Sequence, residues 1–277
     1  MTRSTKLGIL RYAAALLVTA MFQFPLFWWA LTSIKPSSAI FDMDRIVFFD
    51  FIPTWDNYRV TLFGGGPVLF DSRRTLSDSL AVALGATCLT LVLSLPASFA
   101  LSLLPFKLSR AYYLWVIFQR FLPPIVAIIP LVFMFHFAGL LDTRMGLIMA
   151  HTAMNLPFAV LILKSFFDEV PREVGEAAAI DGANRFQIFL NIFTPMIKGG
   201  IAATAVLCFI FSWTEFLLAL FLTNSIRTLP VKALNVMTES WGFTSALTTT
   251  AMIPCFIFIL LSQKHLVRGL TMGFQKG

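Results

Sequence analysis

Five residues with reactive or hydrogen-bonding side chains stand in apolar surroundings, where they could act on a small solute. His151 and Asn155 lie four residues apart, so they share one face of a helix. Trp213, Thr214 and Glu215 follow in a later apolar run. Polar groups inside apolar runs are costly and often functional, so these five residues are our candidates for the lining of a substrate pathway. Because no acid or cysteine stands at metal-ligand spacing with His151, no metal site is expected.

Polar groups inside apolar runs also have structural uses. The carboxyl group of Glu215 must pair, become protonated or face water, and a gating role and a helix-packing role both remain open. His151 and Asn155 either line a pathway or bond between helices. Arg120 lies about two turns inside its run, where it either snorkels to the interface or pairs with an acid. The apolar runs hold no pair of aspartates, which argues against an intramembrane enzyme.

The composition assigns these residues to a membrane protein. The chain has 277 residues, of which 58% are hydrophobic and 13% charged, whereas soluble domains have about 25% charged residues. The net charge of +7 does not indicate nucleic acid, because the basic residues lie at the ends of apolar runs, where they set topology. The sequence therefore predicts an all-α integral membrane protein in the lipid bilayer.

Six apolar runs approach the length of about 20 residues that a helix needs to cross a bilayer. None alternates with the period of a barrel strand. The first run is longer than the core of a signal peptide, about 7–15 residues, so we expect it to be retained. The six predicted transmembrane helices are Tyr12 to Leu31, Leu76 to Leu104, Tyr112 to Ala138, Met145 to Leu163, Gly199 to Thr223 and Thr244 to Ser262.

Short links between these runs predict the orientation. The link from Pro105 to Ala111 carries two bases, Lys107 and Arg110, and no acid, whereas the link from Gly139 to Thr143 carries an acid and no base. By the positive-inside rule, the first of these links is cytoplasmic. Both termini are then cytoplasmic, and so is the loop of residues 168–195. The long segment 35–75 is extracytoplasmic, either as a connector or as a contact surface for a partner.

The 168–195 loop has the local chemistry of two capped helices. Pro171 suits a first helical position, and Gly182 can close a helix in the left-handed conformation. Asn184 can cap a second helix, with Gln187 three residues on as its capping-box partner. We expect this second helix to end at Pro195. Two capped helices in a cytoplasmic loop indicate a surface built for a partner.

The loop resembles the signature of permease subunits of binding-protein-dependent ABC importers. That signature is Glu-Ala-Ala, then Gly after three residues, then Ile and Leu-Pro, and here it reads Glu176-Ala177-Ala178, Gly182, Ile192 and Thr194-Pro195. The only departure is Thr194 in place of Leu. Further matches to carbohydrate importers of the maltose-transporter type are Trp213-Thr214-Glu215-Phe216, Pro123-Pro124 and the tail Gly269-Leu270-Thr271-Met272-Gly273.

The resemblance implies a type I ABC importer transmembrane domain and a partner for each face of the membrane. The expected partners are a homologous second permease, a pair of ATPase subunits inside and a solute-binding protein outside. ATP and Mg would be bound by the ATPase subunits, since this chain lacks a Gly-x-x-x-x-Gly-Lys-Ser/Thr loop. The resemblance also implies that the loop is a coupling helix seated in the ATPase. Its predicted contact residues are Glu176, Ala177, Ala178, Asp181, Gly182, Arg185 and Phe186.

Three regions follow from this interpretation. Residues 1–75 hold the first helix and the extracytoplasmic segment, 76–268 form the transporter core, and 269–277 form a cytoplasmic tail. A self-sufficient secondary transporter or channel of six helices is the alternative, although it leaves the capped loop unexplained. The importer reading predicts a multi-pass subunit of the inner membrane that has no catalytic activity of its own.

Overall fold

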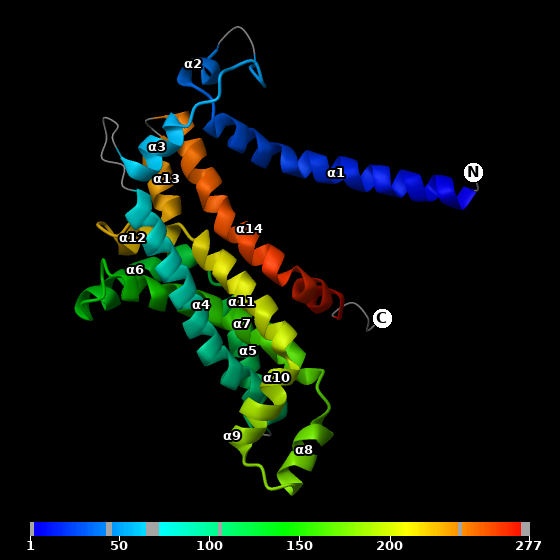
Figure 1. Ribbon diagram of the computed structural model, residues 1–277. Helices are drawn as coiled ribbons and strands as arrows, with labels where there is room; N and C mark the ends of the chain where they lie inside the picture. The colour runs from blue at the N-terminus through cyan, green and yellow to red at the C-terminus, as the bar shows by residue number, and fades with distance from the viewer. Residues whose placement is uncertain (1–2, 43–45, 65–71, 105–106, 238–239, 273–277) are drawn as a thin grey trace. The chain divides into compact units, whose positions relative to one another are not determined.

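A computed structural model describes residues 3–42, 46–64, 72–104, 107–237 and 240–272, and within these ranges every regular element is helical (Figure 1). The predicted all-α class is confirmed. The helices are α1 (Arg3–Ser33), α2 (Ser37–Ile40), α3 (Asp56–Phe63), α4 (Ser72–Leu103), α5 (Ser109–Gln119), α6 (Pro124–Phe137), α7 (Arg144–Asp168), α8 (Arg172–Ile180), α9 (Arg185–Gln187), η1 (Ile188–Phe193, a π-helix), α10 (Thr194–Met196), α11 (Lys198–Trp213), α12 (Leu217–Leu222), α13 (Leu229–Met237) and α14 (Trp241–Met272).

Four helices are long and apolar enough to cross a membrane within the described ranges, and the count rises to six if each of two bent pairs is one span. Four of the six predicted spans, the first, second, fourth and sixth, are continuous helices: α1, α4, α7 and α14. The bent pairs are α5 with α6, at 99°, and the helical stretch Arg185–Met196 with α11, at 78°.

Two predicted spans are not single straight helices. The run from Tyr112 to Ala138 breaks after Gln119, because Pro123 and Pro124 cannot continue the backbone hydrogen bonds of α5. The run from Gly199 to Thr223 breaks after Trp213 and resumes as α12. Neither break was predicted. Irregular backbone at membrane depth is tolerated only where protein covers it or it lines a cavity, so both breaks are candidate functional positions.

The chain divides into two compact units, one of residues 1–74 and 232–253, the other of residues 75–231 and 254–277. In the first unit the segment that follows α1 folds onto the end of that helix. The Asn57 side-chain amide donates to the backbone carbonyls of Ser33 and Lys35, at 2.9 Å each. The ammonium of Lys35 lies 4.1 Å from the ring centre of Trp28, and burial lowers the pKa of Lys35. Buried polar contacts thus hold this segment in place.

The second unit has two apolar clusters that fix its helices. One joins α6, α7 and α12 through Phe135, Leu147 and Leu218. The other joins α4, α7 and η1 through Phe99, Phe167 and Phe193. Because α7 belongs to both clusters, it connects the region of α12 with the region of the 168–195 loop.

Candidate functional site

The 168–195 loop forms the two capped helices that the sequence predicts. Helix α8 begins at Arg172 with Pro171 as its N-cap, and Gly182 has φ +89°, in the left-handed region that favours glycine. The Asn184 side chain accepts from the amide of Gln187, and the Gln187 side chain accepts from the amide of Asn184, both at 2.9 Å. This is the predicted capping box.

The second helix of the loop differs from the prediction in its helix type and in its last residue. After Gln187 the chain takes the wider π-helical turn from Ile188 to Phe193, and the helix ends at Met196 instead of Pro195. The Thr194 hydroxyl donates to the carbonyl of Phe189, five residues earlier, at 2.7 Å. Thr194, the departure from the family signature, thus satisfies a carbonyl inside the π-helix. Short π-helical turns of this kind are frequent at functional sites.

The outward side of the loop exposes apolar side chains at its corner. Ile180 is 86% exposed and Phe186 is 68% exposed. The predicted contact residues Glu176, Ala177 and Asp181 are exposed as well. Large apolar side chains rimmed by charged ones mark protein contact surfaces. The sequence analysis singled out Phe186 but missed Ile180, although a large apolar residue directly before the Asp181–Gly182 turn is a usable signal.

The inward side of the loop is packed against the membrane helices by aromatic rings. Phe193, only 2% exposed, lies against Gly175 of α8: a Cβ at Gly175 would come 2.9 Å from Cε2 of Phe193. The Phe193 ring is 5.6 Å from Phe99 of α4, which is 5.7 Å from Phe167 of α7. Interlocked rings of this kind transmit displacement instead of absorbing it, so α8 is supported on α4 and α7.

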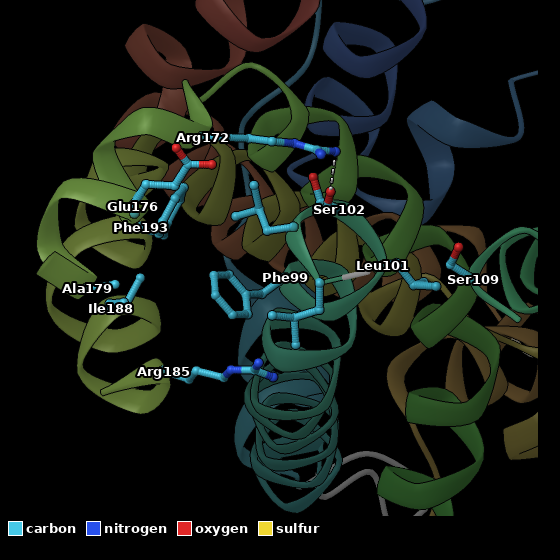
Figure 2. A pocket seen from close by; sticks show the side chains of 13 residues that line it. Phe99, Leu101, Ser102, Ser109, Arg172, Glu176, Ala179, Arg185, Ile188 and Phe193 are labelled. Carbon is cyan, nitrogen blue, oxygen red and sulfur yellow. Dashed lines mark hydrogen bonds between the residues drawn. The ribbon is translucent and has the colours of Figure 1, made fainter. Parts of the chain in front are cut away.

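Polar contacts add a second connection between the loop and α4. The Ser102 hydroxyl donates to the carboxylate of Asp168. The Arg172 guanidinium donates to the carbonyl of Ser102 at 3.3 Å. A cavity of about 520 Å³ lies between α4 and the loop, with Arg172, Glu176 and Phe193 among its lining residues (Figure 2). The predicted contact residue Arg185 also lines this cavity, although its side chain is exposed.

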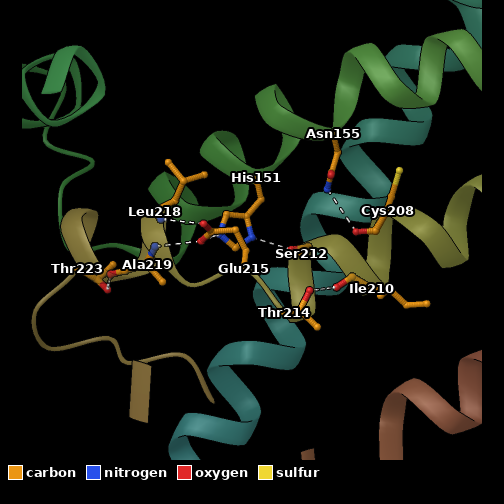
Figure 3. Close-up of polar contacts among 10 residues, drawn as sticks. All are labelled: His151, Asn155, Cys208, Ile210, Ser212, Thr214, Glu215, Leu218, Ala219 and Thr223. Carbon is orange, nitrogen blue, oxygen red and sulfur yellow. Dashed lines mark hydrogen bonds and ion pairs between the residues drawn. The ribbon is translucent and has the colours of Figure 1, made fainter. Parts of the chain in front are cut away.

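Four of the predicted pathway residues, His151, Asn155, Thr214 and Glu215, lie along the contact of α7 with α11 and the break that follows α11 (Figure 3). His151 is 1% exposed and Asn155 5% exposed. The Asn155 amide donates to the carbonyl of Cys208 at 3.3 Å, and Nδ1 of His151 is 2.7 Å from the hydroxyl of Ser212. These two side chains therefore bond between helices. Trp213 is also buried, at 4% exposed, and stacks on Phe209.

Glu215 lies in the break between α11 and α12 and pairs with His151. Its Oε2 atom is 3.3 Å from Nε2 of His151, and its carboxylate also accepts from the amides of Leu218 and Ala219. Thr214, in contrast, is exposed and donates to the carbonyl of Ile210. Among the described residues, no group of three or more His, Cys, Asp or Glu side chains could hold a metal ion.

Arg120 lies at the other helix break. It caps the end of α5, and its guanidinium carbon is 5.1 Å from the ring centre of Phe158. The contact that the structure gives this arginine is therefore with an aromatic face. Its exposed side chain sits at the bend between α5 and α6.

Comparison with known proteins supports the architecture. Residues 91–272 match the family described as the binding-protein-dependent transport system inner membrane component. The chain is 33% identical, over 97% of its length and 94% of the relative's, to the sulfoquinovosyl glycerol transport system permease protein of Agrobacterium fabrum. It is 34% identical, over 91% of its length and 92% of the relative's, to the trehalose transport system permease protein of Mycobacterium tuberculosis.

The fold is shared with a solved transporter. A chain from the crystal structure of a bacterial ABC transporter involved in the import of the acidic polysaccharide alginate matches with a TM-score of 0.75, over 95% of this chain and 98% of that one, at 20% identity. The expected type I importer fold is thereby supported, and the self-sufficient secondary transporter is not. The chain belongs to the family of binding-protein-dependent inner-membrane transport components, the permease subunits of ABC importers.

Proposed function

We propose that this permease forms half of the translocation pathway of a carbohydrate importer. The two relatives named above are permeases for a sulfoquinovosyl glycoside and for trehalose, which supports a sugar, glycoside, polyol or related derivative as the substrate. A homologous permease would form the other half. An extracytoplasmic solute-binding protein would deliver the substrate, and two ATPase subunits would bind ATP and Mg²⁺.

One observation carries the coupling part of this proposal: α8 is exposed on one side and braced on the other. Ile180 and Phe186 supply the apolar area that anchors interfaces, and Glu176 is an exposed carboxylate within reach of a basic group on a partner. Behind them, Phe193 fixes α8 to the α4–α7 cluster. A surface that is both exposed and rigidly supported suits transmission of force from an ATPase. This surface takes no catalytic part, since hydrolysis belongs to the ATPase subunits.

The topology supports the same assignment. The basic residues of the Lys107–Arg110 link favour a cytoplasmic position, and α8 lies on the same side when the spans alternate. Both termini are then cytoplasmic, and segment 35–75 faces the solute-binding protein. Of the predicted pathway residues, Thr214 has an exposed side chain, which favours it as the residue that contacts substrate. The side chains of His151, Asn155 and Trp213 are buried.

Co-purification tests the proposal. The tagged chain, extracted in mild detergent from its native host, should bring down a second permease and an ATPase, identified by mass spectrometry. Glu176→Lys should lose the ATPase and retain the second permease, because it reverses the charge of an exposed carboxylate of α8 at the cavity between α4 and the loop. Glu169→Lys is a matched control, since Glu169 is an exposed carboxylate that precedes α8. A chain that comes down alone in every case would contradict the proposal.

The substrate class has its own test. The solute-binding protein recovered with the complex is titrated with neutral sugars, glycosides, polyols and acidic sugars, and its thermal shift is recorded. Stabilisation by a member of this panel is expected. Stabilisation by amino acids or metal ions instead would overturn the carbohydrate assignment and leave the importer assignment standing.

A further inference from the structure

Helix α12 has a carboxylate bound at each end. At its start, Glu215 accepts from the amide of Leu218 at 2.9 Å and from the amide of Ala219 at 3.2 Å. At its end, Asp142 accepts from the amides of Asn224 and Ser225, at 2.9 and 3.0 Å. The amide of Asp142 itself donates to the carbonyl of Leu222, the last residue of α12, at 2.9 Å. The two acids come from different segments of the chain.

A helix as short as α12 needs such support. It has six residues, so nearly all its backbone groups belong to a first or last turn without an intrahelical partner. Helices of this length are unstable alone, and an unpaired backbone group costs more in lipid than in water. Glu215 satisfies amides at the start of α12, and the amide of Asp142 satisfies the carbonyl of Leu222 at its end. Leu218, Ala219 and Leu222 bury the remaining face against α6 and α7.

The same two acids attach α12 to α7. The carboxylate of Glu215 lies 3.3 Å from Nε2 of His151, which is on α7. On the other side of the same ring, Nδ1 contacts the hydroxyl of Ser212 on α11. Asp142 lies in the turn just before α7 begins at Arg144. Helix α12 is therefore held at the first residues of α7 and again near its second turn.

We call the contacts that Glu215 and Asp142 make with α12 and α7 the α12 clamp. Helix α7 connects this clamp with the 168–195 loop. It has 25 residues and is therefore about 37 Å long, at about 1.5 Å per residue. Its far end carries Phe167 and Asp168, which bind Phe99 and Ser102 of α4 beside the loop. A displacement of the loop along α7 is thus delivered to Asp142 and His151, the two residues where α12 is attached.

We propose that Glu215 is a positioning residue whose carboxylate, with Asp142 at the other end, makes α12 and α7 one rigid body. This body carries movement of the 168–195 loop to the helix break at residues 214–216. The proposal rests on the proposed importer function. It assigns to Glu215 the fixing of α12 and of the adjacent Thr214, without direct contact to substrate.

The test measures the distance between α12 and the far end of α7 in the assembled complex. Spin labels are placed at Leu220 and Ser165, both exposed, after Cys88, Cys208 and Cys255 are replaced by serine. Distance distributions are recorded without nucleotide and with Mg-ADP and vanadate. The unmodified clamp should give one narrow distribution that is the same in both conditions. In Glu215→Ala the distribution should widen or shift by ~5 Å, about one helical turn.

Matched variants distinguish the loss of the Glu215 contacts from a general loss of stability. Glu215→Gln keeps an acceptor for the amide of Leu218 but loses the charge that faces His151, so its effect should be intermediate. His151→Ala should widen the distance distribution. The double variant Glu215→Ala/His151→Ala should give a distribution no wider than that of Glu215→Ala alone. Thr204→Val removes a buried hydroxyl bond to the carbonyl of Gly200, in the first half of α11, and should leave the distribution unchanged.

The outcomes distinguish this proposal from the proposed function. The clamp proposal is wrong if Glu215→Ala gives the wild-type distance distribution. It is also wrong if the widening caused by Glu215→Ala and that caused by His151→Ala simply add in the double variant. Either result leaves the importer function standing. If Glu215→Ala does not insert, Glu215→Gln and Ser225→Ala carry the comparison, because each weakens one end of α12 alone. Absence of vanadate-sensitive ATP hydrolysis in the purified wild-type complex would count against the importer function instead.

Discussion

The ring of Phe193 lies against the backbone of Gly175, so closely that a Cβ at Gly175 would approach Cε2 of Phe193 to 2.9 Å. This contact joins α8 to the π-helix that follows it. Because the same ring packs on Phe99 at 5.6 Å, the loop and α4 are held by one side chain. The contact between Gly175 and Phe193 therefore couples the 168–195 loop to the membrane helices.

Enlarging Gly175 should detach α8 from its support. In Gly175→Val, the new side chain collides with the buried ring of Phe193, which cannot move without disturbing Phe99. We expect the ATPase recovered in a pull-down to fall at least about tenfold, with normal insertion of the chain. Gly175→Ala should lie between wild type and Gly175→Val. Gly8→Val is the control, since a Cβ at Gly8 has nothing within 4 Å; an equal loss there would remove the steric explanation.

Two phenylalanines of the loop should separate stability from docking. Phe193 is buried, so Phe193→Ala should lower the stability of the purified chain by about 3–5 kcal/mol, the usual cost of emptying an aromatic core position. Phe186 is 68% exposed, so Phe186→Ala should change stability by no more than about 0.5 kcal/mol. Phe186→Ala should instead weaken ATPase binding roughly 30-fold, or about 2 kcal/mol.

These two variants are compared by thermal unfolding in detergent and by titration with the purified ATPase. The opposite pattern, in which Phe186→Ala unfolds the chain or Phe193→Ala leaves its stability intact, would show that the inward and outward sides of the loop are assigned the wrong way round.

Asp142 should make the stability of the folded chain depend on pH. The hydrogen bond from the hydroxyl of Ser225 lowers the pKa of Asp142 from 3.8 to about 2, with further help from the amides of Asn224, Ile226 and Ser225. A carboxyl group whose pKa is lower in the folded state stabilises that state fully above its ordinary pKa. This contribution is lost as the pH falls through about 2.

The comparison with Asp142→Asn measures this contribution. Asparagine tolerates the left-handed backbone that Asp142 adopts, with φ +57°, so the variant removes the charge without adding backbone strain. Wild type should unfold at a higher temperature than Asp142→Asn by a constant amount from pH 5 to 8. The difference should shrink below about pH 4. A difference that grows as the pH falls would contradict the assigned role of the carboxylate.

Local sequence chemistry was enough to predict much of the loop. Gly182 and the Asn184–Gln187 box need only neighbouring residues, so their structure follows from short-range rules. The four unbroken spans likewise follow from apolar length. These features do not depend on what packs against them.

The remaining features depend on contacts between distant segments. The π-helical turn at Ile188–Phe193 follows from packing of Phe193 on Phe99 and from the Thr194 hydroxyl, neither of which leaves a periodic signal. The break before α12 was missed because residues 199–223 read as one apolar run, although Glu215 within it was singled out. Its pairing with His151 joins residues that are far apart in sequence, so single-segment reasoning left the packing and pathway roles open.

The most direct test of coupling through α8 is a photo-cross-linking amino acid placed at Ile180 in the complete transporter. Because Ile180 is 86% exposed at the corner of the loop, the account predicts a covalent adduct with the ATPase subunit, and loss of that adduct in Glu176→Lys. The same amino acid at Leu220 of α12, which contacts α7 near its first residues and not at its loop end, should give no ATPase adduct. An ATPase that stays in the complex yet never cross-links to position 180 would contradict the account.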